Sequence, residues 1–406
     1  MVTTFYPPWH FGGDAVHVQS LARALVRAGH DVDVVSFTES YRAAGGRVDA
    51  KTPVAGSTRE ADGVMVHRLD HPLGRWSALW MHQAGSPGPY RSPLAAVLDR
   101  GFDVLHFHNI SLAGGPSVLG TGRARLRMLT LHDFWFVCPT HVLWKNNVRA
   151  CEQPDCTRCC LRSHRPPQLW RLGPARDRAL AKVDVVLAPS DWSARTHRER
   201  GFAAPIEVLP LYSRLAAGTG APRASQARPQ FLCAGRITAS KGVRLLLALF
   251  ARLPDYDLVV AGDGDEHAAL VADFGHLPHV RFTGKVDAAA LRELYAGATA
   301  TVMPSLARES FGMVAVESMS QGTPVIALDA GGLGEVVRAT GGGLVCADPA
   351  ALEQAIHRVA TDVTLRDALG RAGQAACRER YSERRYLDDY LSIVHARLDA
   401  RAVAIA

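Results

Sequence analysis

Residues 305–326 read Ser305-Leu-Ala-Arg-Glu309-Ser-Phe-Gly312-Met-Val-Ala-Val-Glu317-Ser-Met-Ser-Gln-Gly322-Thr-Pro-Val-Ile326. This pattern predicts the end of a strand, a loop containing a glycine, a short helix, a glycine stop and a second strand. In a continuous helix, Glu309 and Glu317 would lie on the same side, about 12 Å apart along the axis. The amides around Gly312 would open that helix and offer donors to an anion. The arrangement suits a ligand with hydroxyl groups at both ends and phosphates between them.

This stretch resembles the donor-site signature of the retaining nucleotide-sugar glycosyltransferases of family 4, the E-x7-E pattern on a GT-B fold. Two glutamates at this spacing are common on solvated helices, and the flanking Ser-x-x-Glu-Ser-Phe-Gly and Gly-Thr-Pro-Val-Ile make the match specific. The resemblance implies that Glu309 binds the hydroxyls of the transferred sugar and Glu317 binds the ribose. It further implies that the loop holds the sugar and phosphate through Ser310, Phe311, Gly312 and Met313.

The chain has the composition of an ordinary globular protein, with 406 residues, 48% of them hydrophobic and 21% charged. This length favours two or three domains. No apolar run approaches the length needed to span a bilayer. The N-terminus lacks the cationic start and apolar core of a signal peptide. We therefore expect a cytoplasmic protein, whose first residue lies a few residues inside the usual beginning of the resembling family.

The first half alternates short apolar strands with helices. The strands are expected at 2–6, 32–37, 64–69, 104–107, 128–131 and 183–188, and a helix is expected at 15–28. Such a rhythm predicts an α/β domain with a doubly wound parallel sheet covered on both faces. We place this first, acceptor-side Rossmann-like domain at residues 1–212.

Residues 213–229 are rich in Gly, Ala, Ser and Pro and lack a hydrophobic period, so they are the expected linker. After them the rhythm restarts, which predicts a second Rossmann-like, nucleotide-sugar-binding domain at 230–380. A closing segment at 381–406 contains a helix that, by resemblance, crosses back onto the first domain. Two such domains, as in the GT-B fold, would face each other across a cleft.

A second motif follows the first strand of the second half: Gly235-Arg236-Ile-Thr-Ala-Ser-Lys241-Gly242. An arginine, a lysine and helix-opening amides at a strand's carboxyl end would neutralise a diphosphate. The resembling family uses this Arg and Lys to stabilise the departing nucleoside diphosphate. The alternative is a plain strand–helix turn with a solvated lysine.

Weaker signals surround this motif. Gly262 and Gly264 end the next strand and would shape a loop beside the nucleotide, although Gly-Asp-Gly also occurs in ordinary turns. Lys285 follows a strand whose end resembles the one that reads the base. In the first half, the resemblance places Gly12 and Gly13 toward the donor phosphate and the acceptor.

His132 follows a predicted strand and, by resemblance, touches the C6 hydroxyl of the sugar and the reacting face. The alternative is an ordinary packed histidine. The family transfers sugar by front-face attack of the acceptor hydroxyl while the diphosphate leaves with the proton. That chemistry needs positioning and charge stabilisation, so we predict catalytic roles for His132, Glu309, Arg236 and Lys241, with no catalytic metal.

Five cysteines fall within 23 residues, and the bare family pattern does not require them. Their spacing, C-x4-C-x2-C with one further thiol thirteen residues upstream, can supply four thiolates to structural zinc. Some members of the resembling family carry a similar cluster. Iron–sulfur ligation, a disulfide and unligated thiols remain alternatives. The candidate ligands are Cys138, Cys151, Cys156 and Cys159, with Cys160 as an alternative.

Between residues 123 and 182 twelve Lys/Arg stand against four Asp/Glu, a local excess that exceeds the net charge of +7. This basic stretch could contact an anionic membrane, placing the enzyme peripherally at the inner face, or a phosphorylated acceptor; a basic face that only aids solubility is the alternative. Four residues between strands of the first half could stack on a sugar or cyclic acceptor, although such aromatics are also common in cores. They are Trp76, Trp80, His82 and Tyr90.

The sequence therefore predicts a retaining transferase of a hexose-type sugar from a nucleoside diphosphate donor, of UDP or GDP type. The acceptor would be a small molecule, a lipid-linked molecule or a glycan, in natural-product or cell-envelope glycan biosynthesis. One alternative keeps the fold and is a sugar-nucleotide epimerase or phosphorylase. Another, a zinc-bearing nucleic-acid-binding protein, leaves the two glutamates and the Arg–Lys motif unexplained, so we expect no nucleic-acid partner.

Overall fold

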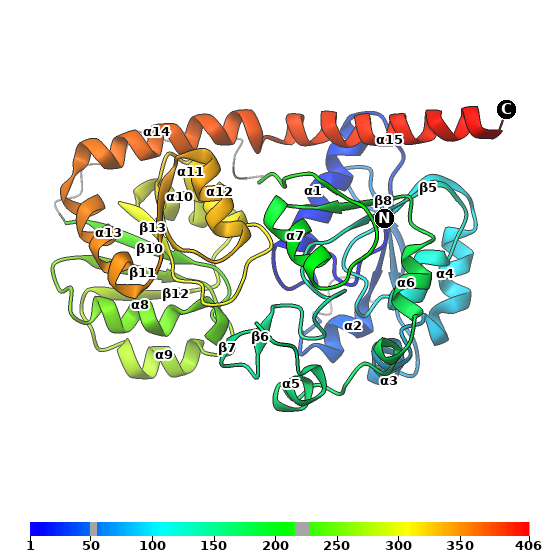
Figure 1. The fold of residues 1–406 in the computed structure, drawn as a ribbon, viewed down its shortest axis with the longest axis horizontal. Coiled ribbons are helices and arrows are strands. Elements are labelled where there is room, and N and C mark those ends of the chain that lie inside the picture. Colours follow the sequence, from blue (N-terminus) through cyan, green and yellow to red (C-terminus); the bar gives the residue numbers. More distant parts are fainter. Residues whose placement is uncertain (49–54, 214, 216–227, 406) are drawn as a thin grey trace. The chain divides into compact units, whose positions relative to one another are not determined.

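A computed structural model describes residues 1–48, 55–213, 215 and 228–405 (Figure 1). The chain divides into two compact units. The first comprises Met1–His141, Cys156–Leu209 and the C-terminal residues from Tyr386 onward, and the second comprises Val142–Asp155 and Pro210–Arg385. The expected linker at 213–229 lies almost wholly outside the described residues. No helix in the described part of the chain is both long and apolar enough to cross a bilayer.

The first unit is built on parallel strands. One sheet has the order β4-β5-β8-β9, and β1 pairs parallel with β3, whose other neighbour, β2, is antiparallel. The bounds are β1 (Asp33–Phe37), β2 (Gly56–Arg59), β3 (Met65–Leu69), β4 (Phe102–Phe107), β5 (Ala124–Thr130), β8 (Val185–Ala188) and β9 (Ile206–Val208).

The predicted first strand at 2–6 is much shorter in the structure. Val2 forms single-residue parallel bridges to Val35 and Phe107, so it lies between β1 and β4. Backbone hydrogen bonds continue as far as Thr4. Pro7 and Pro8 follow, and proline has no amide hydrogen with which to extend a ladder.

The helices of the first unit pack around these strands. Their bounds are α1 (Gly13–Arg27), α2 (Thr38–Ala43), α3 (Arg75–Ala84), α4 (Arg91–Leu98), α5 (Cys156–Arg162), α6 (Ala175–Leu180), α7 (Asp191–Glu199) and α15 (Glu383–Ile405), with a 3-10 turn η3 (Leu169–Leu172). Alternating strand residues face the core, which contains Leu105, Phe107 and Leu129.

The second unit is a six-stranded parallel sheet with the order β12-β11-β10-β13-β14-β15. Strand order reverses between β10 and β13, and in open α/β sheets ligands bind at the carboxyl ends of the strands at such a switch point. The bounds are β10 (Gln230–Ala234), β11 (Asp257–Ala261), β12 (Val280–Gly284), β13 (Ala300–Met303), β14 (Val325–Leu328) and β15 (Gly343–Cys346).

Both faces of this sheet are covered, as the predicted double winding requires. On β10, Phe231 and Cys233 pack into a cluster with residues of α8 and α13. Leu232 and Ala234, which point the other way, pack with residues of α10 and α11. The helices are α8 (Val243–Phe250), α9 (His267–Phe274), α10 (Ala288–Gly297), α11 (Met313–Ser320), α12 (Gly332–Thr340), α13 (Pro349–Thr361) and α14 (Val363–Arg380).

A two-stranded hairpin, β6 (Trp144–Lys145) and β7 (Arg149–Ala150), also belongs to the second unit. It interrupts the first unit in sequence, between β5 and α5. Each unit is therefore built from separate stretches of chain.

Candidate functional site

Two loops meet at the switch point of the second unit. One follows β10 and contains the 3-10 turn η5 (Ala239–Lys241), and the other follows β13 and leads to α11. The carbonyl oxygen of Ser240 accepts hydrogen bonds from the amides of Leu306 and Ala307, at 2.9 and 3.0 Å. The two predicted motifs, about seventy residues apart in sequence, are thus tied together by backbone hydrogen bonds.

Glu309 lies in the loop and not on the helix, which differs from the continuous helix assumed for the Glu309–Glu317 spacing. Its amide donates to the carbonyl of Ala330, and its own carbonyl accepts from the amide of Gly332, so it forms a parallel bridge with Gly331. The helix α11 begins only at Met313. The preceding Gly312 has φ 144°, outside the helical region, which separates the two glutamates into different local structures.

The carboxylate of Glu309 is held by a cation and a hydroxyl. Lys241 Nζ lies 2.5 Å from Glu309 Oε1, and Ser305 Oγ donates to the same oxygen at 2.8 Å. Burial alone would raise the pKa of Glu309, but Lys241, Ser305 and the nearby Arg236 outweigh burial and lower it below its usual value. Glu309 is therefore ionised at neutral pH.

Glu317, inside α11, has a different environment. Tyr295 Oη donates to its Oε2 at 3.0 Å, and Ser213 Oγ donates to its Oε1 at 3.4 Å. Burial raises the pKa of Glu317 to about 7, although the two hydroxyl donors act in the opposite direction. The two carboxylates of the signature thus differ in charge near neutral pH: Glu309 is fully ionised and Glu317 is about half protonated.

The glycines of the neighbouring loops allow a close backbone approach. Gly262, at the end of β11, has φ 143°, and a Cβ there would lie 1.8 Å from the carbonyl oxygen of Gly235. A Cβ on Gly264 would lie 2.3 Å from the carbonyl oxygen of Ile237. These glycines therefore serve a structural contact between the loops after β10 and β11.

The remaining predicted donor-site groups are open to solvent or available for bonding. Arg236 is exposed and forms no ion pair with a described residue. Within the described chain, no backbone hydrogen bond uses the amides of Phe311 and Gly312. The Phe311 ring is buried and packs edge-on against Tyr381, with centroids 5.7 Å apart. Lys285 is exposed just after the edge strand β12.

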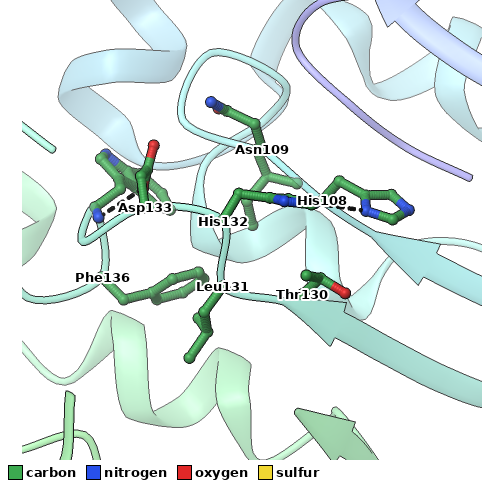
Figure 2. Close-up of a pocket in the computed structure, with 9 residues that line it drawn as sticks. His108, Asn109, Thr130, Leu131, His132, Asp133 and Phe136 are labelled. Atoms are coloured by element: carbon green, nitrogen blue, oxygen red, sulfur yellow. Dashed lines mark hydrogen bonds between the residues drawn. The ribbon is translucent and has the colours of Figure 1, made fainter. Parts of the chain in front are cut away.

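In the first unit, His132 belongs to a small pocket at the carboxyl ends of β4 and β5 (Figure 2). The pocket has space for about one water molecule. It is lined by His108, Asn109, Ile110, Thr130, Leu131, His132, Asp133, Trp135 and Phe136. Asp133 does not hold the histidine: its carboxylate accepts from the Trp135 amide at 2.8 Å and bonds to His141 Nδ1 at 2.8 Å. It fixes the shape of the loop that follows His132.

His132, which is partly exposed, belongs to a group of four contacting histidines, and the other three are buried. His108 Nδ1 lies 3.0 Å from His132 Nε2, and Figure 2 marks this bond. The His108 ring lies 4.0 Å from that of His106, and the His132 ring 5.5 Å from that of His17. Burial lowers the pKa of all four below the ordinary value for histidine, so the cluster is neutral at pH 7.

This cluster ends on two tyrosines of α15. Tyr386 Oη lies 3.3 Å from His17 Nε2, and Tyr390 Oη lies 3.2 Å from His106 Nδ1. Sequence reasoning identified only His132. The available signal was the pair His106 and His108, two residues apart on one face of a strand whose end enters the pocket.

The other predicted residues of the first unit lie at the start of α1. Gly12, with φ 84°, precedes the helix that begins at Gly13, and Asp14 in its first turn accepts a hydrogen bond from Asn109 Nδ2 at 3.1 Å. The four candidate stacking residues differ in exposure. Trp76 and Trp80 are exposed, Tyr90 is fully buried, and His82 bonds to Pro166 and Gln168. The prediction that all four residues stack on a sugar or cyclic acceptor is therefore wrong, because Tyr90 is not accessible.

The structure does not assemble the predicted four-thiolate site. Cys138 belongs to the first unit, as do Cys156, Cys159 and Cys160 on α5, whereas Cys151 lies beside β7 in the second unit. In the part of the chain that is described, no group of three or more His, Cys, Asp or Glu side chains is arranged to hold a metal ion. The eight cysteines also form no disulfide.

Comparison with known proteins places the chain among glycosyltransferases. Residues 11–211 match the family model described as Glycosyltransferase Family 4, and residues 221–376 match Glycosyl transferases group 1. A glycogen synthase from Mycobacterium tuberculosis is 28% identical over 92% of this chain and 88% of that protein. A phosphatidyl-myo-inositol mannosyltransferase from Mycolicibacterium smegmatis is 27% identical over 78% of this chain and 72% of that protein.

Solved structures share the fold. A sucrose-phosphate synthase from Thermosynechococcus elongatus superposes with a TM-score of 0.75 at 20% identity, covering 98% of both chains. The Anabaena protein HepE, solved in complex with UDP and glucose, gives a TM-score of 0.67 at 17% identity, covering 97% of this chain and 98% of that chain. The fold is GT-B, and the chain belongs to the family 4 type of glycosyltransferases.

Proposed function

We propose that the protein is a retaining hexosyltransferase that uses a nucleoside diphosphate sugar, of UDP or GDP type, as donor. The observation that carries this proposal is the set of groups at the switch point of the second unit. The exposed Arg236, the amine of Lys241 and the backbone amides of Phe311 and Gly312 supply positive charge and donors where a diphosphate would bind. Glu309 and Glu317 supply two acceptors of different charge for hydroxyl groups.

The roles follow from the chemistry of each group. An ionised Glu309 accepts hydrogen bonds from sugar hydroxyls, and Glu317 accepts from the ribose hydroxyls. Arg236 and Lys241 stabilise the charge that develops on the departing diphosphate. The acceptor oxygen bonds to the anomeric carbon on the face from which the diphosphate leaves, and the acceptor proton passes to a phosphate oxygen. The first-unit residues His132, Gly12 and Gly13 keep the roles that the resemblance assigns, as predictions.

Some support also comes from other proteins. HepE was solved with UDP and glucose, and the relatives named above act, by their names, on a glycan and on a phosphatidylinositol. We extend the donor class from these proteins to this chain. The acceptor class stays open between a glycan and a lipid-linked molecule, and a small molecule is a third alternative.

A nucleotide panel tests the proposal. UDP, GDP, ADP and dTDP are compared by calorimetric titration, and the matching nucleotide sugars are then assayed for transfer. We expect one nucleotide to bind, and Arg236→Ala to weaken its binding about tenfold to hundredfold because a charge-assisted contact to phosphate is lost. The matched control is Arg244→Ala, which removes an exposed arginine of the same unit paired with Asp273.

Two results would contradict the proposal. The first is that no nucleotide binds, or that Arg236→Ala binds as well as Arg244→Ala. The second is that a nucleotide sugar is epimerised without any acceptor, or yields a sugar phosphate when only inorganic phosphate is added, which would indicate the epimerase or phosphorylase alternative.

A further inference from the structure

The helix α3 of the first unit presents its large apolar side chains to solvent. Trp76 is 61% exposed, Trp80 is 53% exposed and Leu79 is 37% exposed. These residues follow the spacing of one helix face, while the face toward the core carries Ser77, Ala78 and Met81. An ordinary surface helix has the opposite arrangement, with its large apolar residues buried.

A neighbouring segment extends this apolar surface. Leu169 and Leu172, on the turn η3 that contacts α3, are 60% and 86% exposed, and Leu161 on α5 is 62% exposed. We call the five residues of α3 and η3 (Trp76, Leu79, Trp80, Leu169 and Leu172) the apolar platform. Figure 1 shows α3 and α5 at the lower edge of this unit.

The platform is held in place by hydrogen bonds and a cation–π contact. His82 Nε2 donates to the carbonyl oxygen of Pro166 at 2.8 Å, and Gln168 Nε2 lies 3.3 Å from His82 Nδ1. Arg171 lies over the Trp170 ring at 4.3 Å and donates to the carbonyl oxygens of Trp135 and Phe136. The exposed leucines therefore sit on a fixed turn that is anchored both to α3 and to the loop after His132.

The segments that carry the platform are basic, although Asp70, Asp99, Asp155 and Asp177 border them in sequence. Residues 71–98 and 156–176 contain no Asp or Glu. Exposed arginines occur on the same segments, at Arg75, Arg158, Arg162 and Arg165. Exposed tryptophan and leucine bordered by arginine match the chemistry of a bilayer interface, where apolar side chains enter the acyl boundary and cations meet anionic headgroups.

We propose that the apolar platform and its arginines bind the surface of a bilayer that contains anionic lipids. A protein partner with an apolar patch would be a weaker fit, because it would also need carboxylates opposite four arginines. The proposal does not rest on glycosyl transfer. The platform belongs to the first unit, and the donor groups belong to the second, so each can fail alone.

Vesicle flotation tests this. The full chain is mixed with vesicles of phosphatidylcholine alone, or with about 30 mol% phosphatidylglycerol, at about 0.1 M and about 0.5 M NaCl. The apolar variant is Trp76→Ser with Trp80→Ser and Leu172→Ser. The charge variant is Arg158→Gln with Arg162→Gln and Arg165→Gln. The control is Val271→Ser with Val363→Ser, which removes exposed apolar residues of the second unit.

We expect the wild type and the control to float with the anionic vesicles at low salt. The apolar variant should lose at least about tenfold in partition coefficient on all vesicles, because several large apolar side chains no longer enter the interface. The charge variant should lose the preference for phosphatidylglycerol, as the wild type does at high salt. Thermal unfolding and nucleotide binding of the variants should match the wild type, which shows that the fold and the donor site are intact.

Three results would overturn the proposal. The wild type could fail to bind anionic vesicles, or the apolar variant could bind as well as the control. Alternatively, sedimentation could show a wild-type dimer that the apolar variant dissociates while vesicle binding is unchanged, in which case the platform contacts a second copy of the chain.

Discussion

At the scale of single residues, the central contact of the donor site is the ion pair between Glu309 and Lys241. Lys241 lies 2.5 Å from the carboxylate, and Ser305 contributes a hydroxyl donor. A bound diphosphate would draw the ammonium toward phosphate and leave the carboxylate oxygens to sugar hydroxyls. Removing the charge of Glu309 should therefore affect the sugar more than the nucleotide.

We expect Glu309→Gln to lower the rate of sugar transfer about hundredfold or more, since an amide accepts hydrogen bonds less strongly than a carboxylate and holds Lys241 less firmly. Binding of the nucleotide alone should change by less than about threefold. Single-turnover kinetics and calorimetry measure the two effects. The control is Glu353→Gln, a partly exposed glutamate paired with Arg252 in the same unit. Equal transfer rates for both variants would refute the role of Glu309.

The raised pKa of Glu317 gives nucleotide binding a pH dependence. Ribose hydroxyls donate hydrogen bonds and so favour the ionised carboxylate, whose pKa is about 7 without ligand. Affinity should increase as pH rises from 6 to 8, because less work is then needed to remove the proton. Glu317→Gln should flatten this profile and reduce the discrimination between the ribonucleotide and its 2′-deoxy analogue. Titrations at several pH values measure both, and a profile unchanged by the substitution would contradict the assignment.

At the scale of elements, the ends of β10 and β11 are packed too closely for any side chain. A Cβ on Gly262 would lie 1.8 Å from a backbone oxygen that cannot rotate away. The contact joins the loops after β10 and β11, so its loss should disturb both loops.

Gly262→Ala should destabilise the second unit by about 3 kcal/mol or more, because it adds a backbone clash to the strain of a positive φ. Gly284→Ala is the matched control: it also has a positive φ, at the end of the neighbouring strand β12, but no atom lies within 4 Å of the added Cβ. That variant should lose only about 1 kcal/mol. Urea unfolding measures both, and equal losses would show that strain alone matters at Gly262.

The elements themselves could largely be predicted from sequence. Apolar strands such as 325–328 and 183–188, bounded by glycine or polar residues, are found as β14 and within β8 at Val185–Ala188. The errors have local physical causes. Gly312 delays the start of α11, which leaves Glu309 in the loop, and Pro7 and Pro8 follow a first strand that forms only a bridge.

The site could be predicted only in part. The pairing of Glu309 with Lys241 spans 68 residues, and only the resemblance to a family indicated that their motifs belong together. The histidine cluster depends on Tyr390, which is 284 residues from His106, and no local pattern carries such information. The cysteine spacing predicted a four-thiolate site, and no such site is found among the described residues.

At the scale of the whole molecule, the first unit holds four neutral histidines, three of them buried and His132 partly exposed. An unfolded chain binds a proton at each of them below about pH 6.5, whereas the folded chain, in which burial has lowered each pKa, does not. Below about pH 6.5 the unfolded state therefore binds more protons than the folded state, so the free energy of unfolding decreases as the pH is lowered.

We expect the free energy of unfolding of the first unit to fall by more than about 2 kcal/mol between pH 7 and pH 5. Glu317 acts in the opposite direction in the second unit, because its raised pKa makes ionisation unfavourable to folding. Urea unfolding followed by hydrogen exchange distinguishes the two units. A first unit equally stable at both pH values would show that the histidines are not buried neutral groups.

The chain passes between the two units four times, at 141/142, 155/156, 209/210 and 385/386. This has a consequence for biosynthesis. A ribosome that has released every strand of the first unit has not yet made Tyr386 or Tyr390, the hydroxyl partners of His17 and His106. The first unit is therefore completed only after the second unit has been translated, and until then His17 and His106 lack these two hydroxyl partners.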